Sequence, residues 1–272
     1  MSRSVTESVE DLISADPNVD NKNLFKDLWS ITGDLRSQLD KRFDLKLDAS
    51  CSDLQPYQSL DGKAKGFLST WANSEVDWLV HSYLGTPGQS FSNMHLHTWL
   101  GPQINVPHFG MALGTIPDIF FYLDGIPRVE LGQNLEYMDH YYEEANEVYL
   151  KFEEDPEFVP FVSRSLLMRQ AQSAASLCYM VKPSVKNIEK IQNASQGLLT
   201  RWLGWLDAAQ LLPMQEQEKL SERDLHQRKS IAVRDPANVI ADKMFGKEMA
   251  NRLVGTLWGE NRSLPRAGVN YQ

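Results

Sequence analysis

Residues 91–100 (FSNMHLHTWL) and residues 108–114 (HFGMALG) decide the fold, because both alternate between two kinds of side chain. A period of two is typical of β-strands whose faces meet different environments. Only residues 101–107 separate the two segments, which is too few for a crossover helix. We therefore expect two neighbouring antiparallel strands.

The sequence around this pair predicts further strands. Short runs rich in aromatic and aliphatic residues are divided by Gly, Pro and Asn, which favour turns. We expect turns at Gly85-Thr86-Pro87-Gly88, 101–102 and 116–117. The runs predict a largely antiparallel sheet with strands near residues 63–71, 76–84, 90–100, 108–114, 118–123 and 176–181.

Helical periodicity flanks the predicted strands on both sides. Apolar residues recur at helical spacing at Leu24, Leu28, Ile31 and Leu35, for example. The segment 44–56 is expected to be a loop. The pattern predicts helices at 24–43 and 134–152, a long helix from about 185 to 209, and shorter helices at 214–232, 237–245 and 247–258.

Length and element order predict one domain of the α+β class. The 272 residues fit a single domain, expected over residues 23–260, with a weakly ordered leader at 1–22 and a frayed tail at 261–272. Central strands followed by helices predict an antiparallel sheet covered by helices.

Charge and cysteine content exclude several classes of protein. A net charge of −9 argues against nonspecific binding of nucleic acid, which needs a basic surface. Cys51 and Cys178 lie far apart, so neither a disulfide framework nor a thiolate metal site is indicated, and a reducing compartment is expected.

The start of the chain and its hydropathy predict where the protein works. Residues 1–16 carry acidic side chains and no apolar core, which argues against a signal or transit peptide. No stretch approaches the ~18 to 20 apolar residues of a membrane span. We expect a cytoplasmic protein of bacterial type, or a plastid protein if the chain is a processed one.

One face of the strand at 91–100 is expected to contact a ligand. The opposite face is aliphatic and is expected to belong to the core. The ligand face combines two imidazoles, an amide and two aromatic rings, supplied by Phe91, Asn93, His95, His97 and Trp99.

The neighbouring strand carries unusually small residues on one face, which holds His108, Gly110, Ala112 and Gly114. Glycine within a strand often marks a place where something bulky approaches the backbone. If the two polar faces lie on the same side of the sheet, they line a hollow. Such a hollow suits a flat, conjugated molecule with polar edges.

Two other interpretations of the histidines stay open. Each could be a hydrogen-bonded side chain on a solvated face of the sheet. His95 and His97 could also bind one metal ion together, although no third ligand is identified.

The sequence lacks the common motifs for bound redox cofactors and nucleotides. It contains no GxGxxG after a strand, no GxxxxGK[ST] and no cysteine set for an iron–sulfur cluster. If the protein performs redox chemistry, its electrons are therefore expected from a separate donor.

Several uncommon motifs resemble those of red chlorophyll catabolite reductase. The resemblance is collinear over roughly residues 60–258. Its motifs are IFFYLDGIPR at 119–128, NLEY at 134–137, Tyr141-Tyr142, FVSRSL at 161–166 with Arg169, RKSI at 228–231 and MFG at 244–246.

The resemblance implies a fold and an activity. The family belongs with the ferredoxin-dependent bilin reductases, which are α/β/α sandwiches with helices on both faces of a central antiparallel sheet. Its members bind a linear tetrapyrrole between sheet and helices, carry no redox cofactor and take single electrons from reduced ferredoxin. Acidic or imidazole side chains supply the protons.

The family's site residues carry over only in part. Plant members have an acidic residue at the strand position held here by Ala112, and a second one that matches Asp235. Alanine cannot donate a proton, so we expect His95 to replace the missing acid, as related reductases use a strand histidine beside an acid. Gln172 occupies the position at which the plant enzymes use an aromatic side chain to set product stereochemistry.

Asp235 and three basic residues also have simpler interpretations. Asp235-Pro236 precedes a helical pattern, where both residues favour a helix start, and one residue can fill both roles. Arg169, Arg228 and Lys229 could hold propionates or meet an acidic electron donor, or be solvated charges.

The sequence therefore predicts a ferredoxin-dependent reductase of a red chlorophyll catabolite or a biliverdin-type bilin, acting on a CH–CH group. The alternatives are a tetrapyrrole carrier without catalysis and a metalloenzyme using His95 and His97. A homodimer is among the oligomeric states left open. The predicted catalytic residues are Asp235 and His95, without a metal, and the predicted substrate contacts are Phe91, Asn93, His97, Trp99, His108, Gly110, Ala112, Arg169 and Gln172.

Overall fold

A nine-stranded antiparallel sheet forms the centre of the computed structural model, which describes residues 19–85 and 90–259. All paired strands in these ranges are antiparallel, as expected. Their order is β1-β3-β4-β5-β6-β7-β9-β8, with β2 paired to β3. The strands are β1 (Lys46–Leu47), β2 (Tyr57–Gln58), β3 (Lys65–Ala72), β4 (Val76–Gly85), β5 (Ser92–Leu100), β6 (His108–Thr115), β7 (Ile119–Ile126), β8 (Phe158–Pro160) and β9 (Leu177–Val181).

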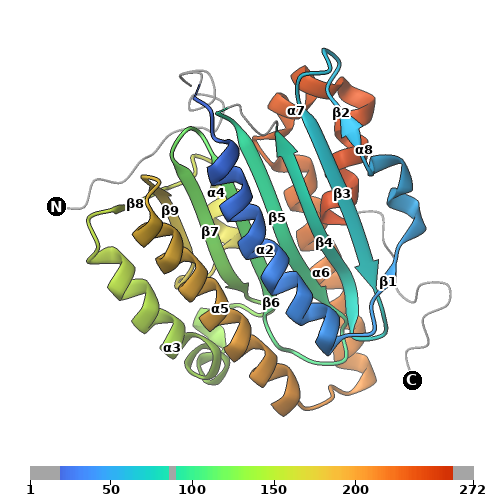
Figure 1. The fold of residues 1–272 in the computed structure, drawn as a ribbon. Helices are drawn as coiled ribbons and strands as arrows, with labels where there is room; N and C mark the ends of the chain where they lie inside the picture. The colour runs from blue at the N-terminus through green and yellow to red at the C-terminus, as the bar shows by residue number, and fades with distance from the viewer. Residues whose placement is uncertain (1–18, 86–89, 260–272) are drawn as a thin grey trace.

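Helices cover both faces of this sheet (Figure 1). One layer contains α2 (Lys22–Arg42), α3 (Leu135–Glu153) and α5 (Val185–Ala208). The other contains α4 (Leu166–Ala171), α6 (Met214–Arg234), α7 (Asn238–Phe245) and α8 (Lys247–Trp258). The expected α/β/α sandwich of the α+β class is therefore confirmed.

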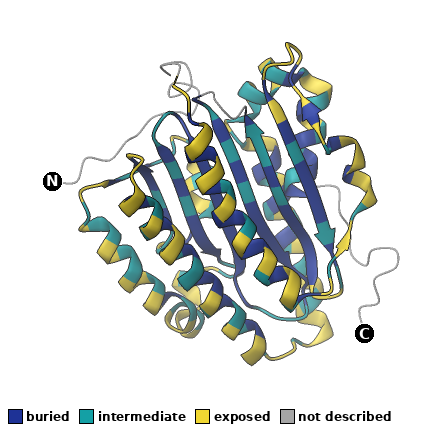
Figure 2. Ribbon diagram, in the orientation of Figure 1, coloured by how far each residue is buried: buried dark blue, intermediate teal, exposed yellow. Residues whose placement is uncertain are grey.

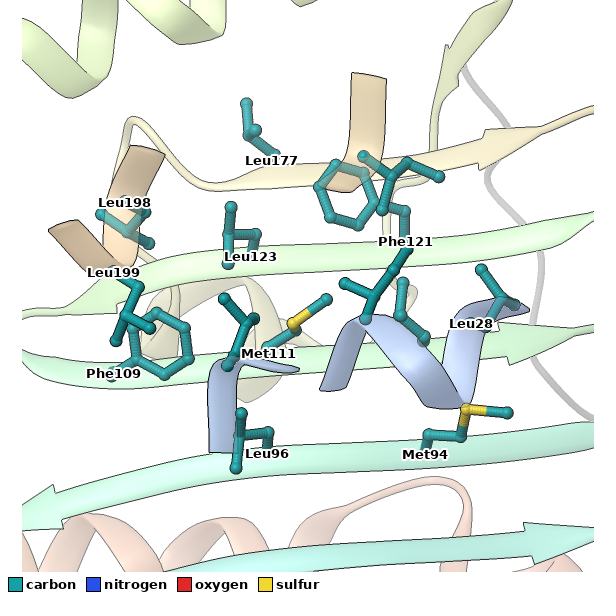
Figure 3. Packing of buried hydrophobic residues seen from close by; sticks show 14 of the residues in the cluster. Leu28, Met94, Leu96, Phe109, Met111, Phe121, Leu123, Leu177, Leu198 and Leu199 are labelled. Carbon is teal, nitrogen blue, oxygen red and sulfur yellow. The ribbon is translucent and has the colours of Figure 1, made fainter. Parts of the chain in front are cut away.

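The main hydrophobic core fills the space between the sheet and the layer of α2, α3 and α5 (Figure 3). Helix α2 buries Leu24, Leu28, Ile31 and Leu35, which recur every three or four residues and so share one face. Figure 2 shows the outer faces of these helices exposed and the strands beneath them buried. Met94, Leu96 and Leu100 join this core from β5, as their alternation predicts.

A second, smaller core lies on the other face of the sheet. Trp78, Trp99 and Ile126 contribute to it from the strands, and Ile231 and Trp258 contribute from α6 and α8. The sheet thus separates two hydrophobic clusters, and the ligand face expected from β5 lies on the side of the smaller one.

Several short elements differ from the expected pattern. The segment 44–56, expected to be a loop, contains β1 and a 3-10 helix at Ala49–Leu54. The short elements β2, β8 and α4 were also not predicted. Lys46 and Leu47 become a strand only because they pair with Ala72 and Trp71 of β3, and two residues carry no periodicity of their own.

Part of the predicted chain lies outside the described residues. This applies to residues 1–18 of the expected leader, to Thr86-Pro87-Gly88 of the expected turn and to the tail from residue 260. The domain boundaries stay a prediction. Within the described ranges, no helix is both long and apolar enough to cross a bilayer.

Candidate functional site

A cavity with an empty volume of about 1080 Å³, including open solvent, lies between the sheet and the layer of α4, α6, α7 and α8. Its position between two layers of the fold is typical of a ligand-binding site. Its described lining is mostly apolar and comprises Phe91, Ser92, Asn93, His95, His97, Ala112, Gly114, Ile116, Phe120, Tyr122, Ile126, Phe161, Ser163, Met168, Ala171, Gln172, Cys178, Ile231, Asp235, Pro236, Ala237 and Trp258.

A second hollow of about 810 Å³ adjoins this cavity under α7 and α8. The two spaces share Phe91, Asn93, His95, Asp235 and Trp258 among their lining residues. His95 and Asp235 therefore lie where the two spaces meet. An elongated ligand could extend from one space into the other past these two side chains.

The floor of the cavity contains a row of residues that crosses four strands. His95 of β5 pairs with Ala112 of β6, Ala112 pairs with Tyr122 of β7, and Tyr122 pairs with Cys178 of β9. Directly opposed residues project from the same face of a sheet, and all four line the cavity. Ala112, with only a methyl group, leaves an open place between the imidazole of His95 and the phenol of Tyr122.

Of the two histidines of β5, His97 is buried and His95 is half-buried, and no polar partner is found for either within the described residues. Both ring nitrogens of His97 are buried without a hydrogen bond, and the rings of His95 and His97 are 5.2 Å apart. Burial lowers the pKa of His95 to about 4 and that of His97 well below its usual value. Both imidazoles are therefore neutral at pH 7, and His97 retains an unused donor and acceptor.

Asp235 combines a local structural contact with a place in the cavity wall. It follows the last residue of α6, and its Oδ1 accepts a hydrogen bond from the backbone N–H of Ala237 at 2.9 Å. Burial raises the pKa of this carboxyl, although the bond from Ala237 opposes the shift. The aspartate thus stabilises the turn before α7 and also lines the cavity, so the two interpretations of the sequence are compatible.

His108 and Trp99 share a face of the sheet with the cavity but are not among its lining residues. Nδ1 of His108 accepts a hydrogen bond from the N–H of Leu100, and its Nε2 lies 3.3 Å from Oδ2 of Asp224. Trp99 stacks at a tilt on His108, with ring centroids 4.7 Å apart. Both side chains thus belong to the packed region next to the cavity.

Gly110 and the basic residues also lie away from the cavity's described lining. A Cβ at Gly110 would meet Cδ1 of Ile126 at 2.8 Å, so the side chain of Ile126 fills the expected hollow there. Arg169 is exposed and donates to the carbonyl of Ser163, a lining residue, at 2.6 Å. Arg228 is buried against Asp77 and is not available to a propionate.

Of the other predicted substrate contacts, four line the cavity. Phe91 does so from the residue before β5, and Asn93 does so from β5 itself. Ala112 lines the cavity from β6, and Gln172 lines it from the residue after α4. The oxygen Oδ1 of Asn93 is buried without a partner among the described residues. The sheet thus brings together most of the residues expected from its alternation.

The sequence analysis did not identify several cavity residues. Phe120 and Tyr122 face the cavity from β7, and their alternation with buried Phe121 and Leu123 is a signal that could have revealed them. Phe161, Cys178 and Trp258 gave no such signal because their neighbours in the cavity are distant in sequence.

The geometry gives little support for a metal site. Within the described residues, no group of three or more His, Cys, Asp or Glu side chains is arranged to hold a metal ion. His95 and His97 are close, yet their other neighbours in the cavity are mainly aromatic and aliphatic.

Comparisons with known proteins identify relatives of this chain. Residues 29–258 match the model of the red chlorophyll catabolite reductase family. The chain is 28% identical over 200 residues to red chlorophyll catabolite reductase 1, chloroplastic, of Oryza sativa subsp. japonica, which is 68% of this chain and 60% of the rice protein. It is also 28% identical over 199 residues to red chlorophyll catabolite reductase of Hordeum vulgare, covering 67% of this chain and 96% of the barley protein.

The fold resembles that of a solved enzyme structure. Phytochromobilin synthase from tomato, crystallised in complex with biliverdin, superposes with a TM-score of 0.69 at 15% sequence identity, covering 80% of this chain and 78% of the tomato chain. At this identity, the match supports the same fold.

Proposed function

Because the chain belongs to the red chlorophyll catabolite reductase family, we propose that it reduces one double bond of a linear tetrapyrrole with electrons from reduced ferredoxin. The substrate is a red chlorophyll catabolite or a biliverdin-type bilin. The reaction consumes two electrons, delivered singly by two ferredoxin molecules, and two protons. The protein supplies the binding site and the protons.

The observation that carries this proposal is the cavity between β5–β7 and the helices α4, α6, α7 and α8. Its aromatic and aliphatic walls suit the conjugated rings of a pigment. The unpaired ring nitrogens of His97 and the unpaired Oδ1 of Asn93 suit the pyrrole N–H and lactam groups along its edge.

Asp235 is the proposed source of the first proton. One-electron reduction makes the pigment a radical anion, which is more basic than the starting pigment and must be protonated before a second electron is useful. Burial already raises the pKa of Asp235. The negative charge of the radical anion raises it further, so the carboxyl holds its proton until the pigment requires it.

His95 has a different proposed part because it is neutral. With a pKa lowered to about 4, it does not carry a spare proton at pH 7 in the empty cavity. It can donate its ring N–H to a pigment oxygen, and it gains a proton more readily once the pigment is anionic. His95 therefore positions the pigment, and after the first electron arrives it can pass on the proton that Asp235 supplies.

The acidic side chains of the pigment are proposed to lie toward the cavity's opening. No Lys or Arg is among the described residues that line the cavity. Arg169, which is exposed and bonded to the lining residue Ser163, is the nearest candidate partner by contact. Carboxylates left in solvent avoid the cost of burying an unpaired charge.

The electron donor is proposed to dock on a local basic surface. The chain carries a net charge of −9, so an acidic ferredoxin would be repelled by the protein as a whole. Productive contact then depends on residues such as Arg169 and Lys229. Turnover is expected to slow as ionic strength rises, because salt screens such contacts.

The test is an anaerobic assay with purified protein, reduced ferredoxin and either biliverdin or a red chlorophyll catabolite. A pigment spectrum that shifts on binding and bleaches on reduction supports the proposal. A shifted spectrum that never bleaches would instead identify the protein as a carrier. The alanine at position 112 favours this alternative because it cannot donate a proton. A stoichiometric metal that is required for activity would indicate the metalloenzyme.

A matched variant shows whether the pigment occupies this cavity. Ala112→Trp places an indole on the cavity floor, whereas Leu166→Trp places one on the exposed start of α4, outside the described lining. We expect the first to weaken binding about 100-fold and the second to leave it unchanged. Equal affinities would place the pigment elsewhere.

A further inference from the structure

A half-buried tyrosine and a buried aspartate form a hydrogen-bonded pair in the cavity floor, away from Asp235 and His95. The hydroxyl of Tyr122 donates to Oδ2 of Asp124 at 3.2 Å. Both residues lie on β7 with one residue between them, so they share the face of the strand that points toward the cavity. Tyr122 lines the cavity, and Asp124 lies behind it at 2% exposure.

Asp124 is held firmly by a third residue. Its Oδ1 accepts a hydrogen bond from the hydroxyl of Ser173 at 2.6 Å, and its Oδ2 accepts one from the backbone N–H of Ser173 at 2.8 Å. These bonds fix the carboxyl with one oxygen toward the phenol. Serine and backbone groups stabilise the ionised carboxylate that remains after a proton has left.

The position of Tyr122 matches the place where the expected acid is missing. Tyr122 lies directly beside Ala112 on the neighbouring strand, and His95 lies beside Ala112 on its other side. With strands about 4.8 Å apart, the imidazole and the phenol stand on residues roughly 10 Å apart, across the open place left by the alanine. A pigment ring lying over Ala112 would have His95 at one edge and Tyr122 at the other.

We propose that Tyr122 and Asp124 form a proton relay that delivers the second proton to the reduced pigment, in place of the acid missing at Ala112. This inference rests on the proposed reductase function. When Asp124 is protonated, its hydroxyl becomes the donor in the bond to the phenol oxygen, and the O–H of Tyr122 is then free to point at the pigment. The Tyr122 phenol gives its proton to the pigment carbanion formed by the second electron, as Asp124 gives its own proton to the phenol oxygen. Tyr122 thus returns to its starting state, the pigment gains a C–H bond, and Asp124 becomes a carboxylate.

The relay needs a route by which Asp124 regains a proton. Asp124 and Ser173 also line a smaller cavity of about 380 Å³ on the side of α3 and α5, which includes Tyr141 and Arg201. Asp124 thus lies between this cavity and the phenol that faces the pigment. Proton return from this side keeps water away from the pigment radical.

The electrostatic setting of Asp124 is compatible with this role. Burial raises its pKa to about 7, even though the hydrogen bonds from Ser173 and Tyr122 oppose the shift. The titratable groups that face it are Tyr122 on β7, Cys178 on β9 and Tyr142 on α3. Burial raises the pKa of all three, with that of Cys178 at about 12, so each is neutral near pH 7.

The test compares Tyr122→Phe with a control, Tyr179→Phe, in the reduction assay. Tyr179 lies on β9 in the opposite core, where its hydroxyl donates to Glu153 at 3.0 Å, so the control also loses one buried hydroxyl and one hydrogen bond. We expect Tyr122→Phe to lower kcat by about 100-fold or more, as for loss of a general acid, with pigment affinity changed less than about threefold. The control should keep the wild-type kcat.

A pH profile separates the relay from a structural role. The rate of the wild type should fall as the pH rises through about 7, because Asp124 must be protonated to act. Ser173→Ala removes a hydrogen bond that stabilises the carboxylate, so it should move this fall to higher pH. Asp124→Asn should lower kcat and abolish the fall.

The outcomes distinguish the two proposals. Bleaching by the wild type together with a fully active Tyr122→Phe variant would overturn the relay and leave the reductase proposal standing. A bound pigment that the wild type never bleaches would overturn both. A slow Tyr122→Phe variant, together with a wild-type pH profile that Ser173→Ala leaves unaltered, would make Tyr122 a donor without Asp124 and would overturn the relay as stated.

Discussion

His95 and Ala112 are direct cross-strand neighbours on the floor of the cavity. We expect Ala112→Asp to restore a second acidic proton donor there. In an Asp235→Asn background, this change should recover turnover at least about tenfold, although burying the new carboxyl costs stability. Single-turnover absorption measurements would check this. Ala112→Asn is the matched control, and equal recovery by the asparagine would refute the argument.

Asp235→Asn tests the proposed donor with little change in shape. The amide oxygen of asparagine can still accept the hydrogen bond from the N–H of Ala237, so the turn before α7 should persist. We expect kcat to fall by about 100-fold or more and the pigment dissociation constant to change by less than about threefold. A fall in affinity that matches the fall in kcat would assign Asp235 to binding instead.

His95→Gln tests a group that both holds the pigment and passes a proton. The amide can replace one hydrogen bond of the imidazole but cannot accept a proton. We expect a large fall in kcat with a modest change in affinity, measured by titration of the pigment spectrum. A variant with normal kcat would remove His95 from the proton path.

The buried histidines predict how stability depends on pH. Burial lowers the pKa of both His95 and His108 to about 4, whereas an unfolded chain protonates histidine near pH 6.5. Between these values the unfolded state holds more protons on these two groups, so the histidines' contribution to the free energy of unfolding falls as the pH drops from about 6.5 to about 4. The raised pKa values of Asp124 and Asp235 contribute with the opposite sign, so the comparison between variants isolates the histidine. Urea denaturation at a series of pH values should show a shallower fall for His95→Gln. The exposed His226 offers the control, and His226→Gln should keep the wild-type slope.

A buried ion pair beside the cavity predicts a large, non-additive effect on stability. Arg128 Nη2 donates to Oδ2 of Asp224 at 2.6 Å, and the guanidinium also bonds the carbonyls of Gly101 and Ile104. Removing one partner leaves a buried charge, so we expect Asp224→Leu and Arg128→Met each to cost about 3–5 kcal/mol. The double variant should cost clearly less than the sum, as measured in a double-mutant cycle by denaturation. Additive costs would mean that the two charges do not stabilise each other.

The sequence was sufficient to predict the sheet because alternation is a local signal. The strands β5 and β6 and the long helix α5 each repeat one pattern over eight or more residues. The face that carries His95 and His97 followed from the same pattern. Elements such as β1 and β8 could not be predicted in this way, because two or three residues become a strand only through their partners.

The site could be predicted only where strands form it. Trp258 and Phe161 reach the cavity from parts of the chain whose position depends on tertiary packing. His108 and Gly110 share the correct face, yet Asp224 and Ile126 occupy the space beside them. Alternation assigns a side to each residue, but it does not show which neighbours fill that side.

The two faces of the sheet differ in what a mutation there would affect. Substitutions beneath α2 and α5 would disturb dense packing and so threaten folding itself. Substitutions that face α4, α6, α7 and α8 at the cavity floor change the lining of a hollow instead of a packed interior. Side chains at the cavity floor can therefore change while the opposite side of the sheet preserves the architecture.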